Sequence, residues 1–161
     1  MDHSGGHPRT PGAVVELEIP ARPEFVGIAR MAVGALAGIR PGLAYERIDD
    51  LRIVVSEACT SAIEVLEPEG SLRLRCIDGP KTLEVRIEAP AAAFESAFPA
   101  GPSAATDPPD TDSFRIALIR ALVDDAELRS TTGGRTELCL VLHRVAAPDE
   151  DDDDDQTIGQ G

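Results

Sequence analysis

Two stretches of the chain repeat apolar side chains every three or four residues, and three others repeat them every second residue. The helical spacing runs through residues 24–39 and 44–66, where it predicts two amphipathic helices. The alternating spacing runs through 71–77, 82–88 and 136–143, where it predicts strands with one buried face. Together these elements predict an α+β fold: a two-layer sandwich whose mixed, mostly antiparallel sheet carries helices on one face.

Weaker signals complete the order of elements. Residues 14–19 alternate loosely and end at a proline, which predicts a first strand, and residues 112–123 carry the stripe of a third helix. A short strand is expected at 126–130, and Gly133-Gly134 predict a turn into the last strand. Residues 89–111 show no period and consist largely of Ala, Pro, Ser, Gly and Asp. Such a segment inside a small domain predicts a lid-like loop or a disordered insertion.

The chain has 161 residues, of which 42% are hydrophobic, so it is long enough for one domain with a real core. We expect that domain at residues 13–146, between a disordered N-terminus at 1–12 and a disordered acidic tail at 147–161. No run reaches the ~18 apolar residues of a membrane span, and residues 1–12 lack the apolar core of a signal peptide. We therefore expect a cytoplasmic protein without a membrane partner.

The charge of the chain is strongly acidic, with a formal net charge of −14. The seven consecutive carboxylates at 149–155 contribute half of it. This charge opposes binding to a phosphate backbone, and a 3% aromatic content without Trp disfavours base stacking, so we expect no nucleic-acid partner. A run of like charges stays disordered. This segment serves either as a solubilising tail or to attract a basic partner electrostatically, which speeds their encounter.

Neither metal binding nor nucleophilic catalysis has positive support in the local motifs. The three cysteines are widely spaced and form no CxxC pair, which disfavours a disulfide framework and a zinc site. The three histidines are too scattered for a metal or catalytic set, and no GxxxxGK[ST] or GxGxxG motif occurs. These residues are Cys59, Cys76, Cys139, His3, His7 and His143.

Four segments carry a resemblance to a known family. They are Val-Glu-Leu-Glu-Ile-Pro-Ala-Arg at 15–22, Ile-Asp-Asp-Leu-Arg-Ile-Val-Val-Ser-Glu-Ala-Cys-Thr at 48–60, Ala-Leu-Ile-Arg-Ala-Leu-Val-Asp-Asp at 117–125, and Gly-Gly-Arg-Thr at 133–136. In these segments, and in the order of its elements, the chain resembles the anti-sigma factor and serine kinase family of bacterial sporulation and stress switches. That family has the histidine-kinase-like ATPase fold, and the resemblance covers residues 14–144.

The resemblance implies a nucleotide site on the second helix. In the family this helix carries a Glu and, four residues later, an Asn, so that both side chains share one face. The Glu orients or deprotonates an attacking hydroxyl, and the Asn oxygen ligates Mg²⁺. Glu57 is therefore the candidate catalytic residue. Ser61 stands at the Asn position as the candidate Mg²⁺ ligand and cofactor-binding residue, with a hydroxyl that is a weaker ligand than a carboxamide. The alternatives are a solvated helix glutamate and a small helix residue.

The glycine boxes that the family uses to bind nucleotide are replaced. Its Asp-x-Gly-x-Gly, whose Asp accepts from the adenine amine, aligns with Ala-Pro-Ala-Ala-Ala at 89–93. Its Gly-x-Gly, whose backbone cradles phosphate, aligns with residues 113–115. There Arg115 is a candidate phosphate contact that does not rebuild the cradle. Thr136 retains the polar residue of the last box, so Arg115 and Thr136 join Ser61 as candidate cofactor-binding residues.

The lost contacts decide the expected function. The adenine contact and the Asn ligand are each worth about 1.5–3 kcal/mol when charge is involved, and together roughly two to four decades of affinity. We therefore expect an anti-sigma factor-like regulator that sequesters an alternative sigma factor and is countered by an anti-anti-sigma partner. It would use ATP weakly or not at all and need no cofactor.

Two alternatives remain open. One is an active serine kinase that uses ATP and Mg²⁺ to phosphorylate the anti-anti-sigma factor. The other is an adaptor that binds no sigma factor. The resemblance also implies a possible homodimer, formed through the sheet side.

Overall fold

The computed structural model describes residues 12–95 and 111–146. The expected disordered termini and most of the expected loop fall on residues 1–11, 96–110 and 147–161, which lie outside the described residues.

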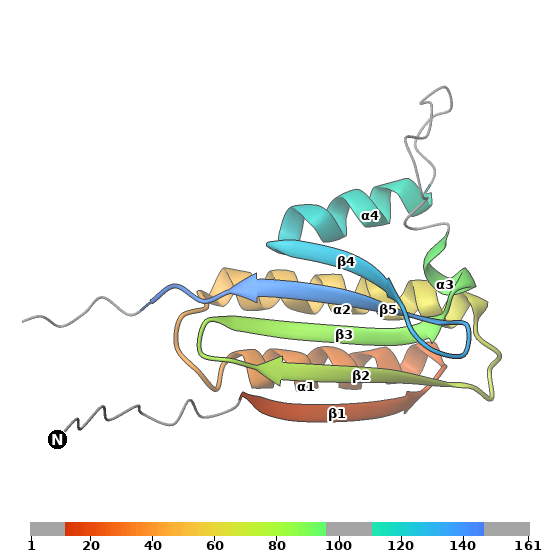
Figure 1. Ribbon diagram of the computed structural model, residues 1–161, viewed down its shortest axis with the longest axis horizontal. Coiled ribbons are helices and arrows are strands. Elements are labelled where there is room, and N and C mark those ends of the chain that lie inside the picture. The colour runs from red at the N-terminus through yellow and green to blue at the C-terminus, as the bar shows by residue number, and fades with distance from the viewer. Residues whose placement is uncertain (1–11, 96–110, 147–161) are drawn as a thin grey trace, which may run out of the picture.

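The described elements follow the expected order (Figure 1). The first part of the chain forms β1 (Ala13–Pro20), a 3₁₀ turn η1 (Pro23–Phe25), α1 (Val26–Ala37) and α2 (Tyr45–Val65). The middle forms β2 (Ser71–Asp78), β3 (Thr82–Pro90) and the short helix α3 (Ala92–Glu95). The last described part forms α4 (Thr111–Leu122), β4 (Asp125–Ser130) and β5 (Arg135–His143).

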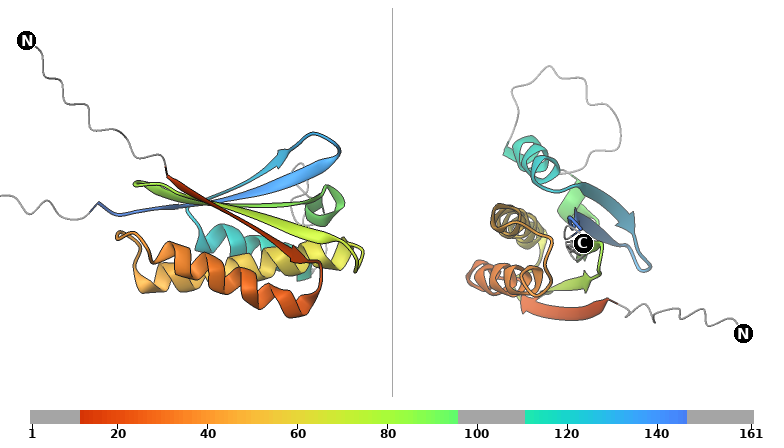
Figure 2. Two further views of the ribbon diagram at one scale, coloured as in Figure 1. Left: turned by 90° about the horizontal axis from the view of Figure 1, so that it is seen from below. Right: turned by 90° about the vertical axis from the view of Figure 1, so that its left-hand side faces the viewer.

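The strands form one sheet in the order β1-β2-β3-β5-β4, and each neighbouring pair is antiparallel. We expected a mixed, mostly antiparallel sheet; the described strands contain no parallel pair. Short turns join β2 to β3 and β4 to β5, which forces those pairs to be antiparallel. The helices cover one face of the sheet and leave the other open (Figure 2), so the two-layer α+β sandwich is confirmed.

The core lies between the sheet and the helices. Every second strand residue points toward the helices, and α2 contributes its buried stripe from the other side. Burial of each large apolar side chain stabilises this core by about 1.5–3 kcal/mol. Its largest fully buried members include Leu51, Val54, Val55, Leu72, Leu74, Leu83, Ile87, Leu138, Leu140 and Leu142.

The first predicted helix divides into two parts. The segment begins as the 3₁₀ turn η1 and becomes α-helical only from Val26. Within α1, Gly34 allows a close approach to α2, because a Cβ there would lie 2.2 Å from Nε of Arg52. Glycine is unfavourable inside a helix, so this position is explained by packing.

The expected loop at 89–111 begins later than predicted. Strand β3 continues to Pro90 through its pairing with β5, and α3 follows at once. Ala89, Ala93 and Phe94 are buried in the core. A run of alanines has no contrast between polar and apolar faces, which is why the sequence pattern does not reveal these seven residues as ordered.

A buried ion pair lies at the end of the sheet away from α3, beside the β2–β3 turn. The side chains of Asp78 and Arg144 are each 2% exposed, and Nη2 of Arg144 lies 2.5 Å from Oδ1 of Asp78. Nε of Arg40 donates to the other carboxylate oxygen at 2.9 Å. Arg144 also donates to the carbonyl oxygens of Ala37, Arg40, Pro41 and Gly79. This cluster ties the end of β5 to the α1–α2 connection and to the β2–β3 turn.

Candidate functional site

Helix α2 places the two candidate residues of the second helix on one face. Glu57 and Ser61 are one turn apart and both are half-buried. Glu64 continues the same face a further turn along, since residues four and seven positions apart lie one above the other on a helix. This face of α2 meets α4, which Figure 1 shows beside it at the margin of the helical layer.

Arg115 of α4 lies against this face of α2. Its Nη1 and Nη2 donate to the two carboxylate oxygens of Glu64 at 2.9 and 3.1 Å, and its Nε lies 3.5 Å from Oε2 of Glu57. The Arg115 side chain is only 18% exposed, compared with 36% for Glu57 and 53% for Glu64. One guanidinium therefore pairs with two carboxylates. Its pair with Glu64 is bidentate, the geometry in which arginine binds a carboxylate most strongly, and its pair with Glu57 is longer.

Thr136 sits apart from α2, at the start of β5. It is 5% exposed and lies opposite Ala89 of β3 and Ser130 of β4 in the strand register. Its parity is that of Leu138 and Leu140, so it belongs to the helix-facing side of the sheet. The structure thus brings Glu57 and Arg115 together through ion pairing, with Ser61 on the same face of α2, and leaves Thr136 on the sheet below.

The segment aligned with the adenine box is packed into the core. Ala89 is fully buried, Ala93 is 2% exposed and Phe94 is 1% exposed. Phe94 is among the largest fully buried side chains of the described chain, and α3 packs against both α2 and β3. The side chains of this segment therefore fill space between β3 and α2.

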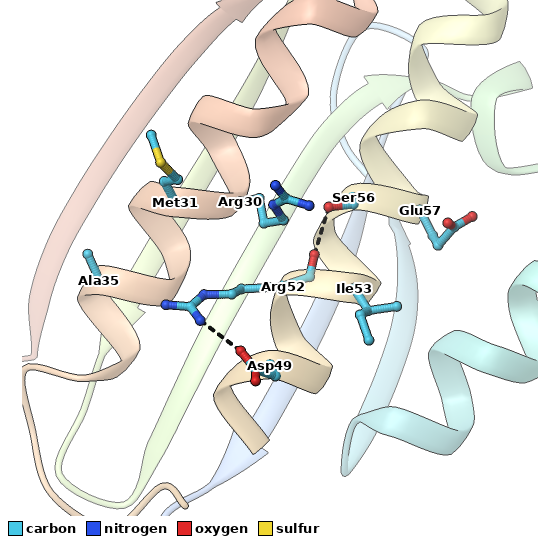
Figure 3. A pocket seen from close by; sticks show the side chains of 8 residues that line it. All are labelled: Arg30, Met31, Ala35, Asp49, Arg52, Ile53, Ser56 and Glu57. Carbon is cyan, nitrogen blue, oxygen red and sulfur yellow. Dashed lines mark hydrogen bonds and ion pairs between the residues drawn. The ribbon is translucent and has the colours of Figure 1, made fainter. Parts of the chain in front are cut away.

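A hollow of about 860 Å³ lies on the outer side of α1 and α2 and reaches Glu57 at one end (Figure 3). Its apolar lining includes Met31, 66% exposed, and Ile53, 45% exposed. Nη1 of Arg52 donates to Oδ1 of Asp49 at 2.7 Å across its floor. This groove was not predicted from the sequence, although an apolar residue on the polar side of each helix is a signal for it.

The open face of the sheet carries neighbouring side chains of opposite charge. A second hollow of about 490 Å³ lies there, over β1, β2, β3 and β5. The row of pairs includes Arg73 with Glu18, Arg75 with Glu16, and Arg86 with Glu84 and Glu137. The hydroxyl of Ser71 donates to Glu18, and this hydrogen bond, followed by the charge of Arg73, lowers the pKa of that carboxyl.

The three cysteines are free and buried. Burial raises the pKa of Cys59 to about 12, with a smaller contribution from the nearby Cys76. Burial also raises the pKa of Cys76 and of Cys139 to about 11. A thiol with such a pKa is almost wholly protonated near neutral pH, so these residues are packing groups with little nucleophilic character.

The described residues hold neither a metal-binding cluster nor a membrane-spanning helix. Residues 12–95 and 111–146 contain no group of three or more His, Cys, Asp or Glu side chains arranged to hold a metal ion. In the same part of the chain, no helix combines the length and the apolar character needed to cross a membrane.

Comparison with known proteins agrees with the fold. Residues 19–142 match the histidine kinase-like ATPase domain. Over 142 residues, covering 81% of this chain and 87% of the relative, the chain is 30% identical to the serine-protein kinase RsbW of Bacillus pumilus. It is 32% identical to RsbW of Bacillus velezensis over 128 residues, 74% of this chain and 79% of the relative. It is 28% identical to RsbW of Oceanobacillus iheyensis over 153 residues, 89% and 94% of the two chains.

The chain therefore belongs to the histidine kinase-like ATPase domain family. Within that family it is similar to the serine-protein kinases named RsbW, which confirms the resemblance to the anti-sigma factor and serine kinase family.

Proposed function

We propose that this chain is an anti-sigma factor-like regulator that binds an alternative sigma factor by surface complementarity, is countered by an anti-anti-sigma protein, and makes weak or no use of ATP. The observation that carries the proposal is the ion pairing of Arg115 with Glu57 and Glu64. The carboxylate that a kinase of this family would use as its base is already engaged by a side chain of the same protein.

The filling of the adenine segment supports weak ATP use. Where the resemblance calls for a carboxylate and two glycines, this chain has Ala89, Ala91 and Ala93, and the buried Phe94 follows. Alanine offers no acceptor to the adenine amine, and the methyl groups of Ala89 and Ala93 and the phenyl ring of Phe94 take up room in the core. A nucleotide would have to displace packed side chains, which opposes binding.

The donor set around Ser61 does not suit Mg²⁺. This ion favours several oxygen ligands in near-octahedral geometry. Here Ser61 supplies one hydroxyl, and the nearest candidate carboxylate, Glu57, has a guanidinium 3.5 Å from its Oε2. A cation at this carboxylate would meet that positive charge at close range, so no step of the proposed function passes through a metal ion.

The groove on α1 and α2 supports binding of another polypeptide. A hollow of about 860 Å³, lined by the exposed Met31 and Ile53 and by Arg30 between the two helices (Figure 3), combines apolar anchors with charged groups. Such grooves accept amphipathic helices of partner proteins. We propose that this groove contacts the sigma factor or the anti-anti-sigma protein, and that the two compete for the same or an overlapping surface.

The charge of the chain supports the choice of a basic partner. The formal charge of −14, half of it in residues 149–155, favours encounter with the basic segments by which sigma factors face DNA and polymerase. Electrostatic attraction of this kind raises association rates more than final affinity.

An active serine kinase is the alternative function, and one observation favours it. Glu57 is present and stands at the end of the groove, and the relatives are named serine-protein kinases. In this alternative Glu57 acts as base, Ser61 replaces the Asn ligand, and Arg115 leaves its carboxylates to contact phosphate.

The first experiment is affinity purification of the full chain from a bacterial host that encodes its sigma factors, with identification of what is bound. The proposal expects a sigma factor or a small anti-anti-sigma protein. Titration with ATP, with and without Mg²⁺, is expected to give millimolar or weaker binding. Micromolar binding, together with phosphate transfer that disappears in Glu57→Ala, would establish the kinase.

The second experiment tests the groove with two matched variants. Met31→Asp places a charge in the groove, and Val145→Asp places the same charge at an exposed position beyond β5, 76% exposed, outside it. The proposal expects Met31→Asp to weaken partner binding at least tenfold while Val145→Asp changes it less than twofold. Equal effects of the two variants contradict the placement of the partner.

Three further expectations accompany this function: a cytoplasmic location, a role in stress response, and a homodimer. The resemblance places the dimer contact on the sheet side, where the described face is lined by ion pairs between β1 and β2 and within β3. Salt screens such pairs. Sedimentation at low and high salt is therefore expected to show a dimer that weakens as salt is added.

A further inference from the structure

Helix α4 is held to α2 by one arginine at each end. At its start, Arg115 of α4 pairs with Glu57 and Glu64 of α2. At its far end, Arg47 of α2 donates to the carbonyl oxygen of Leu122 at 3.0 Å and to Oδ2 of Asp124 at 2.7 Å. The helix is thus fixed at two separate points along α2.

The apolar anchors of α4 form a narrow row. Ile116 is 9%, Ile119 2% and Val123 6% exposed, whereas Phe114, in the first turn, is 64% exposed. Among the α4 side chains that the structure describes, Phe114 is mostly exposed and the buried row begins only after Arg115. Segments with few apolar contacts open at lower free energy than the whole fold, so the ion pairs of Arg115 act at a point where its neighbour Phe114 adds little buried apolar area.

Arg115 also changes the chemistry of the face that it covers. Two carboxylates, Glu57 four residues before Ser61 and Glu64 three residues after it, face one guanidinium that is 18% exposed. Any ligand that needs the Glu57 carboxylate, whether a hydroxyl to be deprotonated or a cation, competes with that guanidinium. The competition takes place in a partly buried setting, where charge pairing is stronger than at the open surface.

We propose that Arg115 is an autoinhibitory latch: it holds the first turn of α4 against α2 and keeps Glu57 engaged, so that this carboxylate becomes available only when α4 has moved away. The latch deepens the proposed function and rests on its site, because it supplies a physical reason for weak ATP use. It makes a claim about the free chain that needs neither a sigma factor nor ATP to be tested.

Hydrogen exchange of the full-length chain is the primary test. Arg115→Gln removes the charge with a side chain of similar polarity, and Arg129→Gln removes an exposed ion pair with Glu127 on β4 as the matched control. The latch expects the amides of residues 115–118, whose hydrogen bonds close the first turn of α4, to exchange at least fivefold faster in Arg115→Gln, and within twofold of the parent chain in Arg129→Gln. Arg47→Gln is expected to act instead at the last turn of α4 and at Asp124.

The geometry also fixes the order of effects. Glu64→Gln removes the bidentate partner and is expected to speed exchange more than Glu57→Gln, which removes the longer 3.5 Å pair. If Arg115→Gln does not fold, Glu64→Gln carries the test, since the Glu64 side chain is 53% exposed and Arg115 keeps its ion pair with Glu57 in that variant.

A chemical readout separates the latch from a purely structural contact. Amidation of Glu57 by a carbodiimide and an amine, followed by mass spectrometry, is expected to be several-fold faster in Arg115→Gln than in the parent chain or in Arg129→Gln. Unchanged exchange in α4 together with unchanged Glu57 amidation overturns the latch. Micromolar ATP binding by the parent chain would instead contradict the proposed function, whatever the exchange rates.

Discussion

Replacing Asp78 with Ala tests the cluster that joins three parts of the fold. The carboxylate accepts from Arg40 at 2.9 Å and from Arg144 at 2.5 Å, and Asp78 is 1% exposed. In Asp78→Ala the guanidinium of Arg144, whose side chain is 2% exposed, stays buried without its counter-charge.

The expected loss follows from that burial. Breaking a buried ion pair by removing one partner costs about 3–5 kcal/mol, because the remaining charge is not compensated. Natural domains have a free energy of unfolding of only about 5–15 kcal/mol, so the loss is a large fraction of the total. With roughly 4 °C per kcal/mol for a domain of this size, the Tm is expected to fall by about 10–20 °C.

Urea and thermal unfolding followed by circular dichroism measure this loss. The matched control is Glu127→Ala, which breaks an ion pair whose side chains are 47% and 55% exposed and is expected to change stability by less than about 1 kcal/mol. A loss below about 1 kcal/mol in Asp78→Ala would refute the reasoning.

A double substitution separates the charge effect from simple loss of packing. Asp78→Leu and Arg144→Met each leave one charge of the pair behind, whereas the combined variant removes both. Buried pairs replaced by apolar groups are often close to neutral. The double variant is therefore expected to lose about 1–3 kcal/mol less free energy of unfolding than the two single variants lose together. A double loss equal to the sum of the single losses would contradict a buried ion pair.

Three other predictions address the core, the thiols and the tail. Phe94→Ala empties a 1% exposed position and is expected to lower the free energy of unfolding by about 3–5 kcal/mol in urea melts; a smaller loss than 1 kcal/mol would mean that Phe94 is not packed. Since burial raises the pKa of Cys59 from 9.0 to about 12 and that of Cys76 from 9.0 to about 11, the unfolded thiols release protons first. The stabilisation that the buried, protonated thiols provide is therefore complete below about pH 8 and is lost as the pH rises from 9 toward 11. In urea melts across that range, the free energy of unfolding should depend less on pH in Cys59→Ala than in the parent chain. Deleting residues 149–155 is expected to slow partner association mainly at low salt; an unchanged rate in stopped-flow mixing would leave the segment as a solubilising tail.

Periodicity predicted the fold well where side chains alternate clearly. Apolar and charged residues alternate without a break through residues 72–75 and 83–88, and both stretches lie in strands. The method failed at residues 89–95, because alanine is small enough to be buried or exposed at little cost and carries no pattern.

The candidate site was predictable only in part. The four-residue step from Glu57 to Ser61 fixes a shared helix face, and the structure has both on α2. The partner of Arg115 could not be predicted, since it depends on which helix packs against α2. Local sequence also gives no sign of the Asp78–Arg144 pair, whose members are 66 positions apart.

The position of β5 in the sheet sets a condition on how the chain can be made. It is the last described strand, yet it lies between β3 and β4, and β4 has its described pairing with β5 alone. A nascent polypeptide that has reached only residue 134 holds a three-stranded ribbon and an orphaned β4, with apolar edges open to neighbours. Such chains are prone to aggregate during synthesis. Truncations that remove β5 are therefore expected to be insoluble, even though every residue of α2 and α4 is still present.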